Sequence, residues 1–196
     1  MARVDYYFSV ISPFTYLAAG RLEQIAKRRG AEIAYKPMDI LHVFSQTGGT
    51  PVGQRHPSRQ AYRLQELTRG AHKAGLPIRL SPAHWPTDPL PASCAVIAVA
   101  EKGGKAGSLA QYFLSACWAK DRDIAEPAVV AEGLETIGED AAALGEAMAA
   151  AEQTYLRFTD DAVANGVFGA PFYVVGEHRF WGQDRLIDLD AHLAGH

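Results

Sequence analysis

The feature that most constrains this 196-residue chain is the order of its strand-like and helix-like segments. Residues Val4 to Val10 (VDYYFSV) are rich in aromatic and β-branched side chains, as buried strands are, and Ser12-Pro13 follows as a typical helix start. Apolar residues then recur with helical spacing as far as Gly30, and Ala31 to Met38 (AEIAYKPM) predicts a second strand. This order predicts a right-handed β-α-β unit with parallel strands.

The middle of the chain has a different character. Residues 47–57 (TGGTPVGQRHP) are glycine, proline and polar residues, which predict a long loop, and long loops of this kind are often functional. Ser58 is expected to cap the next helix, over residues 58–74. Helical spacing continues over 92–102, 108–120 and 127–137, and residues 140–164 predict one long helix or two short ones. This part of the sequence therefore predicts an all-helical block.

The end of the chain returns to β character. Phe172 to Val175 and His178 to Trp181 predict two strands joined by a tight turn, and a last helix opens at residues 182–184. The complete order, β-α-β, a helical block, then β-β-α, is that of an α/β thioredoxin-like fold with an all-helical insertion. We expect residues 1–45 plus 165–196 to form the thioredoxin-like domain and residues 46–164 to form the helical insertion domain.

Composition and charge exclude several classes of function. The 19 Lys and Arg and 22 Asp and Glu give a net charge of −3, so there is no positive field to bind nucleic acid or an anionic membrane. No segment has the length of a membrane span, and Ser12-Pro13 interrupts the early apolar stretch, so we expect a cytoplasmic protein. Apart from His192 and His196, which are spaced by four near the end of the sequence, the histidines show no metal-ligand spacing, and residues 48–53 lack the lysine of a phosphate-binding loop. We therefore expect no metal and no nucleotide.

The two cysteines, Cys94 and Cys117, lie in apolar helix-like stretches and form no C-x-x-C pair. We expect both to be buried free thiols. The tip of the first predicted strand, where thioredoxin-like oxidoreductases carry C-x-x-C, has the sequence SPFT (residues 12–15) instead, which excludes dithiol exchange. A helix N-terminus with a hydroxyl donor can still bind a thiolate that another molecule supplies, and glutathione is such a molecule. The alternative is that Ser12 only caps the helix.

A second candidate feature is Gly169-Ala170-Pro171, directly before a predicted strand. If the peptide bond before Pro171 is cis, the N–H and C=O groups of Ala170 turn outward beside the first helix. There they can pair, in the manner of a β-strand, with an extended peptide ligand. The alternative is a plain turn before an edge strand.

A third candidate feature is the segment Trp181-Gly182-Gln183-Asp184 at the start of the last predicted helix. A helix N-terminus can bind a carboxylate, and the Asp184 carboxylate can bind an ammonium group, so the segment fits the zwitterionic head of an α-amino acid. The alternative is a capped helix with an aromatic residue packed beneath it.

These features together resemble a known enzyme family. The start (VDYYFSVISPFTYLA), the end (NGVFGAPFYVV) and the run FWGQDRL are similar to the 2-hydroxychromene-2-carboxylate isomerases, in the DsbA-like, kappa-class glutathione transferase branch of the thioredoxin superfamily. The resemblance extends through Lys120 to Ile124 and covers nearly the whole chain. It implies a glutathione-dependent isomerisation in aromatic degradation, between a hydroxychromene carboxylate and its open-chain benzylidenepyruvate. It also implies a possible homodimer, although the sequence shows no exposed apolar stripe.

The resemblance assigns roles to matching residues. It implies that Ser12 holds the glutathione sulfur and that Ala170, before a cis Pro171, pairs with the glutathione cysteine through its backbone. The residues that match the segment around the γ-glutamyl end are Trp181, Gly182, Gln183 and Asp184. The loop with Gln54 and Arg55 matches the one that faces the second substrate, a small aromatic carboxylate.

An arginine is the candidate for binding the carboxylate of that substrate. Arg55, or Arg59 on the next helix, can contact a carboxylate through two hydrogen bonds. Arg59 and Arg63 are spaced by four residues, however, and this spacing also favours a solvated helix face.

The chain departs from the pattern of the family at four positions, namely Ser9, Phe44, Gly70 and Phe172. These departures concern the side that receives the aromatic substrate, while the thiol-binding side is intact. Two alternative functions therefore remain open. One is a kappa-like glutathione S-transferase acting on another electrophile, and the other is a thioredoxin-like protein that binds glutathione without turnover.

Overall fold

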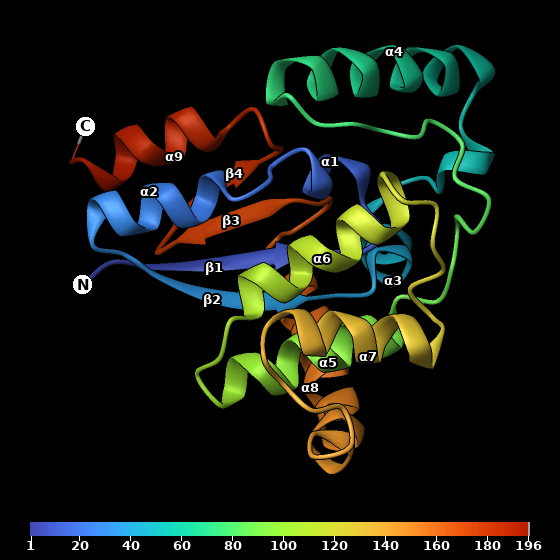
Figure 1. Ribbon diagram of the computed structural model, residues 1–196. Helices are drawn as coiled ribbons and strands as arrows, with labels where there is room; N and C mark the ends of the chain where they lie inside the picture. The colour runs from blue at the N-terminus through green and yellow to red at the C-terminus, as the bar shows by residue number, and fades with distance from the viewer. Residues whose placement is uncertain (196) are drawn as a thin grey trace.

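The computed structural model describes residues 1–195; residue 196, the last of the predicted C-terminal segment, lies outside them. Four strands of the described residues form one sheet in the order β2-β1-β3-β4 (Figure 1). They are β1 (Arg3–Phe8), β2 (Glu32–Pro37), β3 (Phe172–Val175) and β4 (His178–Trp181). Strand β1 pairs in parallel with β2 and antiparallel with β3, and β3 pairs antiparallel with β4. This arrangement confirms the predicted thioredoxin-like α/β fold.

The aromatic run in β1 reflects its central place in the sheet. Successive side chains of a strand point to opposite faces, and both faces of β1 are covered. On one face the Tyr6 ring stacks on the rings of Phe8 and Tyr173, with centroids 4.6 and 5.2 Å apart. On the other face Tyr7 packs in a separate apolar cluster with Met38 and Phe172. A strand that is buried on both sides needs apolar residues at nearly every position.

The prediction of a single helix after Ser12 is wrong. The structure has two helices there, α1 (Pro13–Tyr16) and α2 (Arg21–Arg29). The chain turns between them at Ala19 and Gly20, where φ is 21° and 65°. Gly20 adopts this positive φ without the steric cost that a side chain imposes. Because α1 has only four residues, its dipole contributes little to the binding of an anion, such as a thiolate, at Ser12.

The predicted helical block is present, with shifted boundaries. Its helices are α4 (Pro57–Ala74), α5 (Leu90–Glu101), α6 (Ala106–Trp118), α7 (Pro127–Thr136) and α8 (Gly145–Ala164). The expected cap at Ser58 is wrong, because the N-cap is His56, whose ring nitrogen accepts a hydrogen bond from the Ser58 N–H. The last helix, α9 (Leu186–Leu193), starts only after a turn over residues 183–185.

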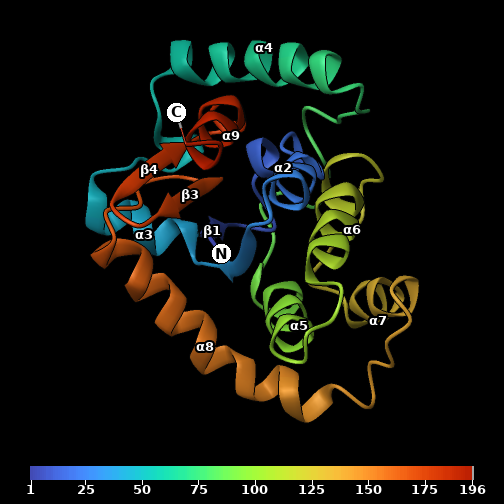
Figure 2. The same cartoon turned by 90° about the vertical axis from the view of Figure 1, so that its left-hand side faces the viewer.

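The sequence prediction missed two elements between β2 and α4. One is α3 (Ile40–Thr47), where the Asp39 carboxylate accepts hydrogen bonds from the N–H groups of Leu41 and His42 and so caps the helix. The other is a short 3₁₀ turn, η1 (Val52–Gln54), inside the predicted loop. Both precede α4, which runs along the outside of the molecule (Figures 1 and 2).

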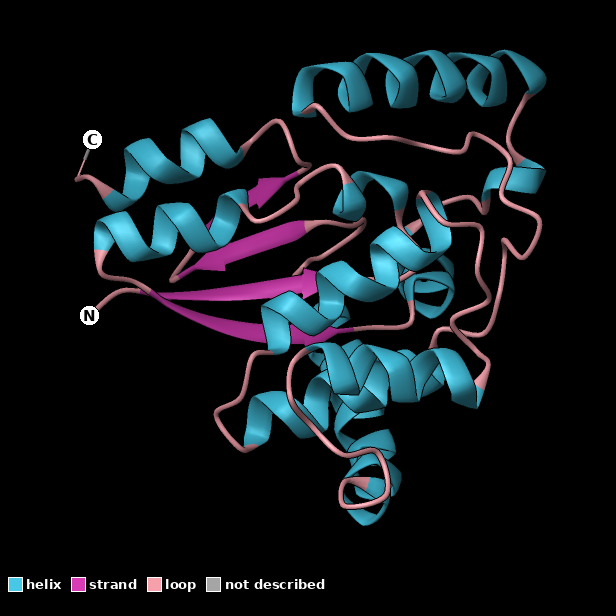
Figure 3. Cartoon of the chain, viewed as in Figure 1, coloured by secondary structure: helices cyan, strands magenta, loops and turns pink. Residues whose placement is uncertain are grey.

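The helices cover both faces of the sheet (Figure 3). Helices α1, α2, α6 and α9 supply residues to the cluster that contains Tyr6 and Phe8, whereas α3 and the end of α8 supply those around Tyr7. The first cluster also continues into the helical block, where Phe113 and Trp118 of α6 are fully buried. The sheet and the helical block therefore share one hydrophobic core.

Cys94 and Cys117 are both free and buried, which confirms the prediction. Burial raises the pKa of the Cys94 thiol to about 11 and that of Cys117 to about 12. Since the thiolate is the reactive form of cysteine, neither residue is a nucleophile near neutral pH. None of the helices in the described part of the chain is long and apolar enough to cross a membrane.

We predict that the native protein resists alkylation by iodoacetamide at about pH 8, because both thiols are buried and stay protonated there. Intact-mass spectrometry should show an unmodified native chain and, after unfolding in guanidinium, two adducts. Rapid labelling of either cysteine in the native state would show that a protein thiol is reactive after all.

Candidate functional site

The candidate site is a cavity of about 590 Å³ at the end of β1 where the chain enters α1. One wall consists of residues 11–14 together with residues 168–170 and Trp181. The rest of the lining comes from α3, the loop of residues 47–53, three arginines on or before α4, and Trp85-Pro86. Segments from both ends and from the middle of the chain therefore build the cavity, and its lining is mostly apolar.

Ser12 lies on the wall formed by α1. Its Oγ accepts a hydrogen bond from the Thr15 N–H at 3.2 Å, which is the helix-capping contact, and donates one to the Ala170 carbonyl at 3.3 Å. The capping role and a role in the site thus coexist, because a hydroxyl accepts and donates at once. The contact with Ala170 is long for an O–H···O bond, so the proton can be redirected to a better acceptor in the cavity.

Ala170 and Pro171 are joined by a cis peptide bond. Ala170 lines the cavity, whereas Pro171 is buried behind it. The Pro171 carbonyl accepts a hydrogen bond from the Gly182 N–H at 2.9 Å, so the turn after β4 is held against the proline. The two C-terminal motifs predicted from the sequence are therefore one structural unit beside Ser12.

Trp181 forms an exposed aromatic edge of the cavity. Its ring packs edge-to-face on Phe168, with centroids 4.8 Å apart, and 53% of Trp181 is exposed. Gly169 lies beneath the indole, where any Cβ would collide with the Trp181 ring. Glycine is thus required at this position for the tryptophan to reach the cavity wall.

Gln183 and Asp184 lie in the turn next to the cavity, not on its wall. The Gln183 side-chain oxygen accepts a hydrogen bond from Arg21 at 3.0 Å, which leaves its NH₂ group free to donate. The Asp184 carboxylate is 60% exposed and lies 3.1 Å from Arg185. The turn therefore combines an amide donor, an exposed carboxylate and Arg185, and Arg21 of α2 lies beside it.

The loop before α4 places Arg55 and Gln54 differently. Arg55 lines the cavity, where its Nε donates to the Thr50 carbonyl at 2.7 Å and its guanidinium lies 5.7 Å from the centre of the Phe44 ring. Burial, with a smaller effect of Arg59, lowers the pKa of Arg55. Gln54 is exposed and does not line the cavity.

The expectation that Arg63 lies on a solvated helix face is wrong. Only 8% of Arg63 is exposed, and its guanidinium lies 5.1 Å from the centre of the Trp85 ring and 5.8 Å from that of Trp118. The sequence contained a signal for this burial, because Arg63, Leu67 and Ala71 are spaced by four and share the buried face of α4. Arg59 lines the cavity as well but is exposed.

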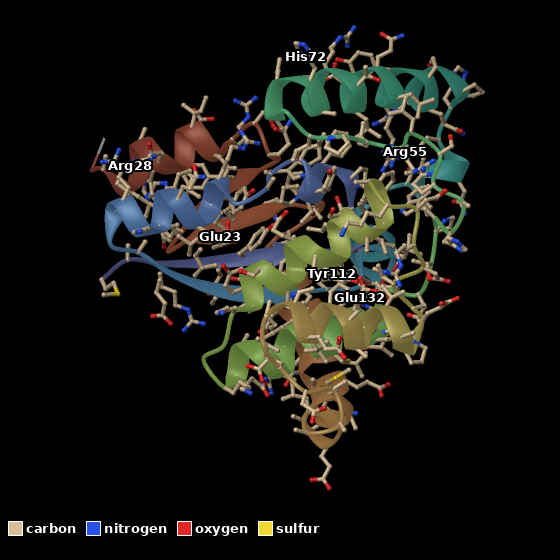
Figure 4. All side chains as sticks on the ribbon, in the orientation of Figure 1. Glu23, Arg28, Arg55, His72, Tyr112 and Glu132 are labelled. Atoms are coloured by element: carbon tan, nitrogen blue, oxygen red, sulfur yellow. The ribbon has the colours of Figure 1, made fainter. Side chains whose placement is uncertain are left out.

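The chemistry available in the cavity is limited to hydrogen bonding and positive charge. The described residues contain no group of metal-ligating side chains, and no cysteine lines the cavity wall that they form. Figure 4 shows Arg55 on the side of the molecule below α4. The cavity residues can thus donate hydrogen bonds to a bound ligand and attract an anion.

Comparison with known proteins places the chain in a family. A family model described as a DSBA-like thioredoxin domain matches residues 3–194. A 2-hydroxychromene-2-carboxylate isomerase of Sphingobium xenophagum is 30% identical over 97% of this chain and 97% of its own length. A solved structure of such an isomerase has a TM-score of 0.79 and 26% identity, and the match covers 98% of this chain and 95% of the other.

A more distant relative is glutathione S-transferase kappa 1 of Caenorhabditis elegans, which is 25% identical over 95% of this chain and 88% of its own length. All three matches span nearly the full length of both proteins, so they include the sheet, the helical block and the segments that line the cavity. The chain therefore belongs to the DSBA-like thioredoxin family, in the group that contains the 2-hydroxychromene-2-carboxylate isomerases.

Proposed function

We propose that this protein is a glutathione-dependent isomerase that interconverts 2-hydroxychromene-2-carboxylate, or a close analogue, with trans-o-hydroxybenzylidenepyruvate. The observation that carries the proposal is the position of Ser12, which lines an apolar cavity that also contains arginines. Among the described residues, neither cysteine of the protein lines this cavity. The similarity to enzymes named as isomerases of this substrate supports the same assignment.

The residues beside the cavity suit three parts of glutathione, namely its sulfur, its cysteinyl unit and its γ-glutamyl end. Ser12 would hold the sulfur, and the backbone of Ala170 would pair with the cysteinyl unit, since Ala170 lies just before β3 and outside the residues that pair with β1 and β4. The turn of residues 181–184 would hold the γ-glutamyl end, with the free amide of Gln183 on its carboxylate and Asp184 on its ammonium. Each contact joins groups of opposite polarity.

When bound, glutathione supplies a thiolate whose reversible addition to the conjugated substrate permits rotation about the former double bond. Ser12 donates a hydrogen bond to the sulfur and so stabilises its anionic form. Ser12 is therefore an activating group and not itself a nucleophile. The arginines of the cavity lining bind the substrate carboxylate, and the apolar lining excludes water from the reacting atoms.

A kappa-like glutathione S-transferase is the second candidate, because the kappa relative matches nearly the whole chain. Both candidates need the same thiolate site, and they differ in what occupies the rest of the cavity. Phe44, one of the positions at which the sequence departs from the family resemblance, lines that part of the cavity. The substrate and not the thiol therefore separates the two functions.

The test is to assay the purified protein and glutathione with a hydroxychromene carboxylate and, separately, with chlorodinitrobenzene. We expect the absorbance change of ring opening with the first and no conjugate above background with the second. Conjugation without isomerisation would establish the transferase instead, and glutathione binding without either reaction would establish a binding protein.

We predict that Ser12→Ala lowers kcat by about 10²–10³-fold, the typical effect of removing one donor to a developing anion. It should also raise the pKa of the bound glutathione thiol, measured by the ultraviolet absorbance of the thiolate. Ser45→Ala on α3 is the control, because the Ser45 hydroxyl donates only to a local carbonyl.

Loss of the α1 cap also costs about 1 kcal/mol of stability in Ser12→Ala, so thermal unfolding is recorded beside the kinetics. A purely structural role would lower the unfolding temperature and leave the thiol pKa unchanged. That outcome would contradict the proposed contact with sulfur.

We predict that Asp184→Asn weakens glutathione binding by about tenfold to a hundredfold, because a charge-assisted contact with the ammonium group is lost. Binding of 2-mercaptoethanol, which has no γ-glutamyl group, should be unchanged. Asp188→Asn is the matched control, since Asp188 also pairs with Arg185 but lies on α9. Calorimetric titration of the three proteins measures both ligands; equal losses in the two variants would remove Asp184 from the site.

A further inference from the structure

Arg63 is a buried cation that has no counter-ion among residues 1–195. Only 8% of the residue is exposed, and its guanidinium lies among the Trp85 and Trp118 rings. No carboxylate of residues 1–195 pairs with it, and no aspartate or glutamate among those residues lines the cavity. A buried charge without a partner is unfavourable, so Arg63 weakens the fold unless something else neutralises it.

Two further arginines increase the positive charge. Arg55 and Arg59 line the same cavity, and burial together with Arg55 lowers the pKa of Arg63 to about 10. Arg63 still carries its charge near neutral pH. The cavity therefore has a cluster of like charges in an apolar setting, where attraction for an anion is stronger than in water.

The surroundings of Arg63 are rigid. The Trp85 indole N–H donates a hydrogen bond to the Ile11 carbonyl at 3.0 Å, directly before Ser12, and the Trp85 and Trp118 rings pack with centroids 5.5 Å apart. The guanidinium is thus held by aromatic rings and not by hydrogen-bond acceptors, which leaves its N–H groups available to a ligand. Trp85 therefore links Arg63 to the backbone directly before Ser12.

We propose that Arg63 is the anchor of an anion subsite that takes the carboxylate of a planar aromatic ligand. A guanidinium offers two parallel N–H donors that match a carboxylate, and the apolar cavity lining accepts the attached ring. Arg63 forms the deep end of the subsite, and the exposed Arg59 lies toward solvent. This inference deepens the proposed function, because the same subsite would orient its substrate, but it requires no glutathione.

The test is calorimetric titration of the protein with 2-naphthoate, and with 2-naphthamide as the uncharged probe of the same shape, in the absence of glutathione. We expect the wild-type protein to bind naphthoate at least tenfold more tightly than naphthamide. Arg63→Met should abolish this preference, lower naphthoate affinity by about tenfold to a hundredfold and leave naphthamide affinity unchanged. Naphthoate should also change the tryptophan fluorescence of the wild-type protein, since Trp85 and Trp118 contact Arg63.

Arg69→Met is the matched control on the same helix, because Arg69 is exposed and pairs with Glu66. It should bind naphthoate like the wild-type protein. Arg63→Met should unfold at a temperature equal to or above that of the wild-type protein, because an apolar side chain replaces an unpaired buried charge. If Arg63→Met does not fold, Arg63→Lys tests the same point: it keeps the charge but lacks the paired donors, and its naphthoate affinity should fall at least tenfold.

Unchanged naphthoate affinity in the folded Arg63→Met or Arg63→Lys variant would overturn the proposal. The outcome is independent of the reaction assays. Naphthoate binding through Arg63 without isomerisation would uphold the subsite and remove the isomerase function, whereas isomerisation with unchanged naphthoate binding in the variants would do the reverse.

Discussion

The pairing of β1 with β3 is the interaction on which the candidate site depends. Tyr6 lies opposite Tyr173 and Tyr7 opposite Phe172, and the Tyr6 and Tyr173 rings stack 5.2 Å apart on the buried face. This pairing brings Ser12 and Ala170, which are 158 residues apart in the sequence, within 3.3 Å of each other. The hairpin partner β4 then carries Trp181 to the same edge. The binding groups of both chain ends thus follow from one strand pairing.

The helical block supplies what the sheet cannot. It shares the core of the sheet through α6, and through α4 it places a buried cation in the lining of the cavity. The cavity therefore combines the Ser12 hydroxyl and the backbone of Ala170 with guanidinium groups in an apolar setting. This division suits a reaction in which a thiol and an anionic aromatic compound have to meet. The protein's own thiols are buried elsewhere and stay protonated.

Local sequence was sufficient for the strands, the order of the elements and most helices, because aromatic and β-branched runs, Ser-Pro and Gly-Ala-Pro act over a few residues. The break at Ala19 and Gly20 was missed because the helical spacing of apolar residues continues across it. Helix α3 was missed because its eight residues are too few to show a clear helical repeat of apolar positions. The burial of Arg63 depends on Trp85 and Trp118, which are distant in sequence, so only its spacing from Leu67 indicated it. Gln54, predicted beside Arg55, points to solvent because η1 turns the chain there.

The central claim is that the Ser12 hydroxyl binds and activates the sulfur of glutathione. A crystal structure of the protein with glutathione tests it most directly. We expect the sulfur atom to lie within hydrogen-bond distance of Ser12 Oγ, with the cysteinyl backbone paired to Ala170 and the γ-glutamyl end at residues 181–184. Glutathione bound with its sulfur away from Ser12, or no glutathione in crystals soaked at saturating concentration, would contradict the account.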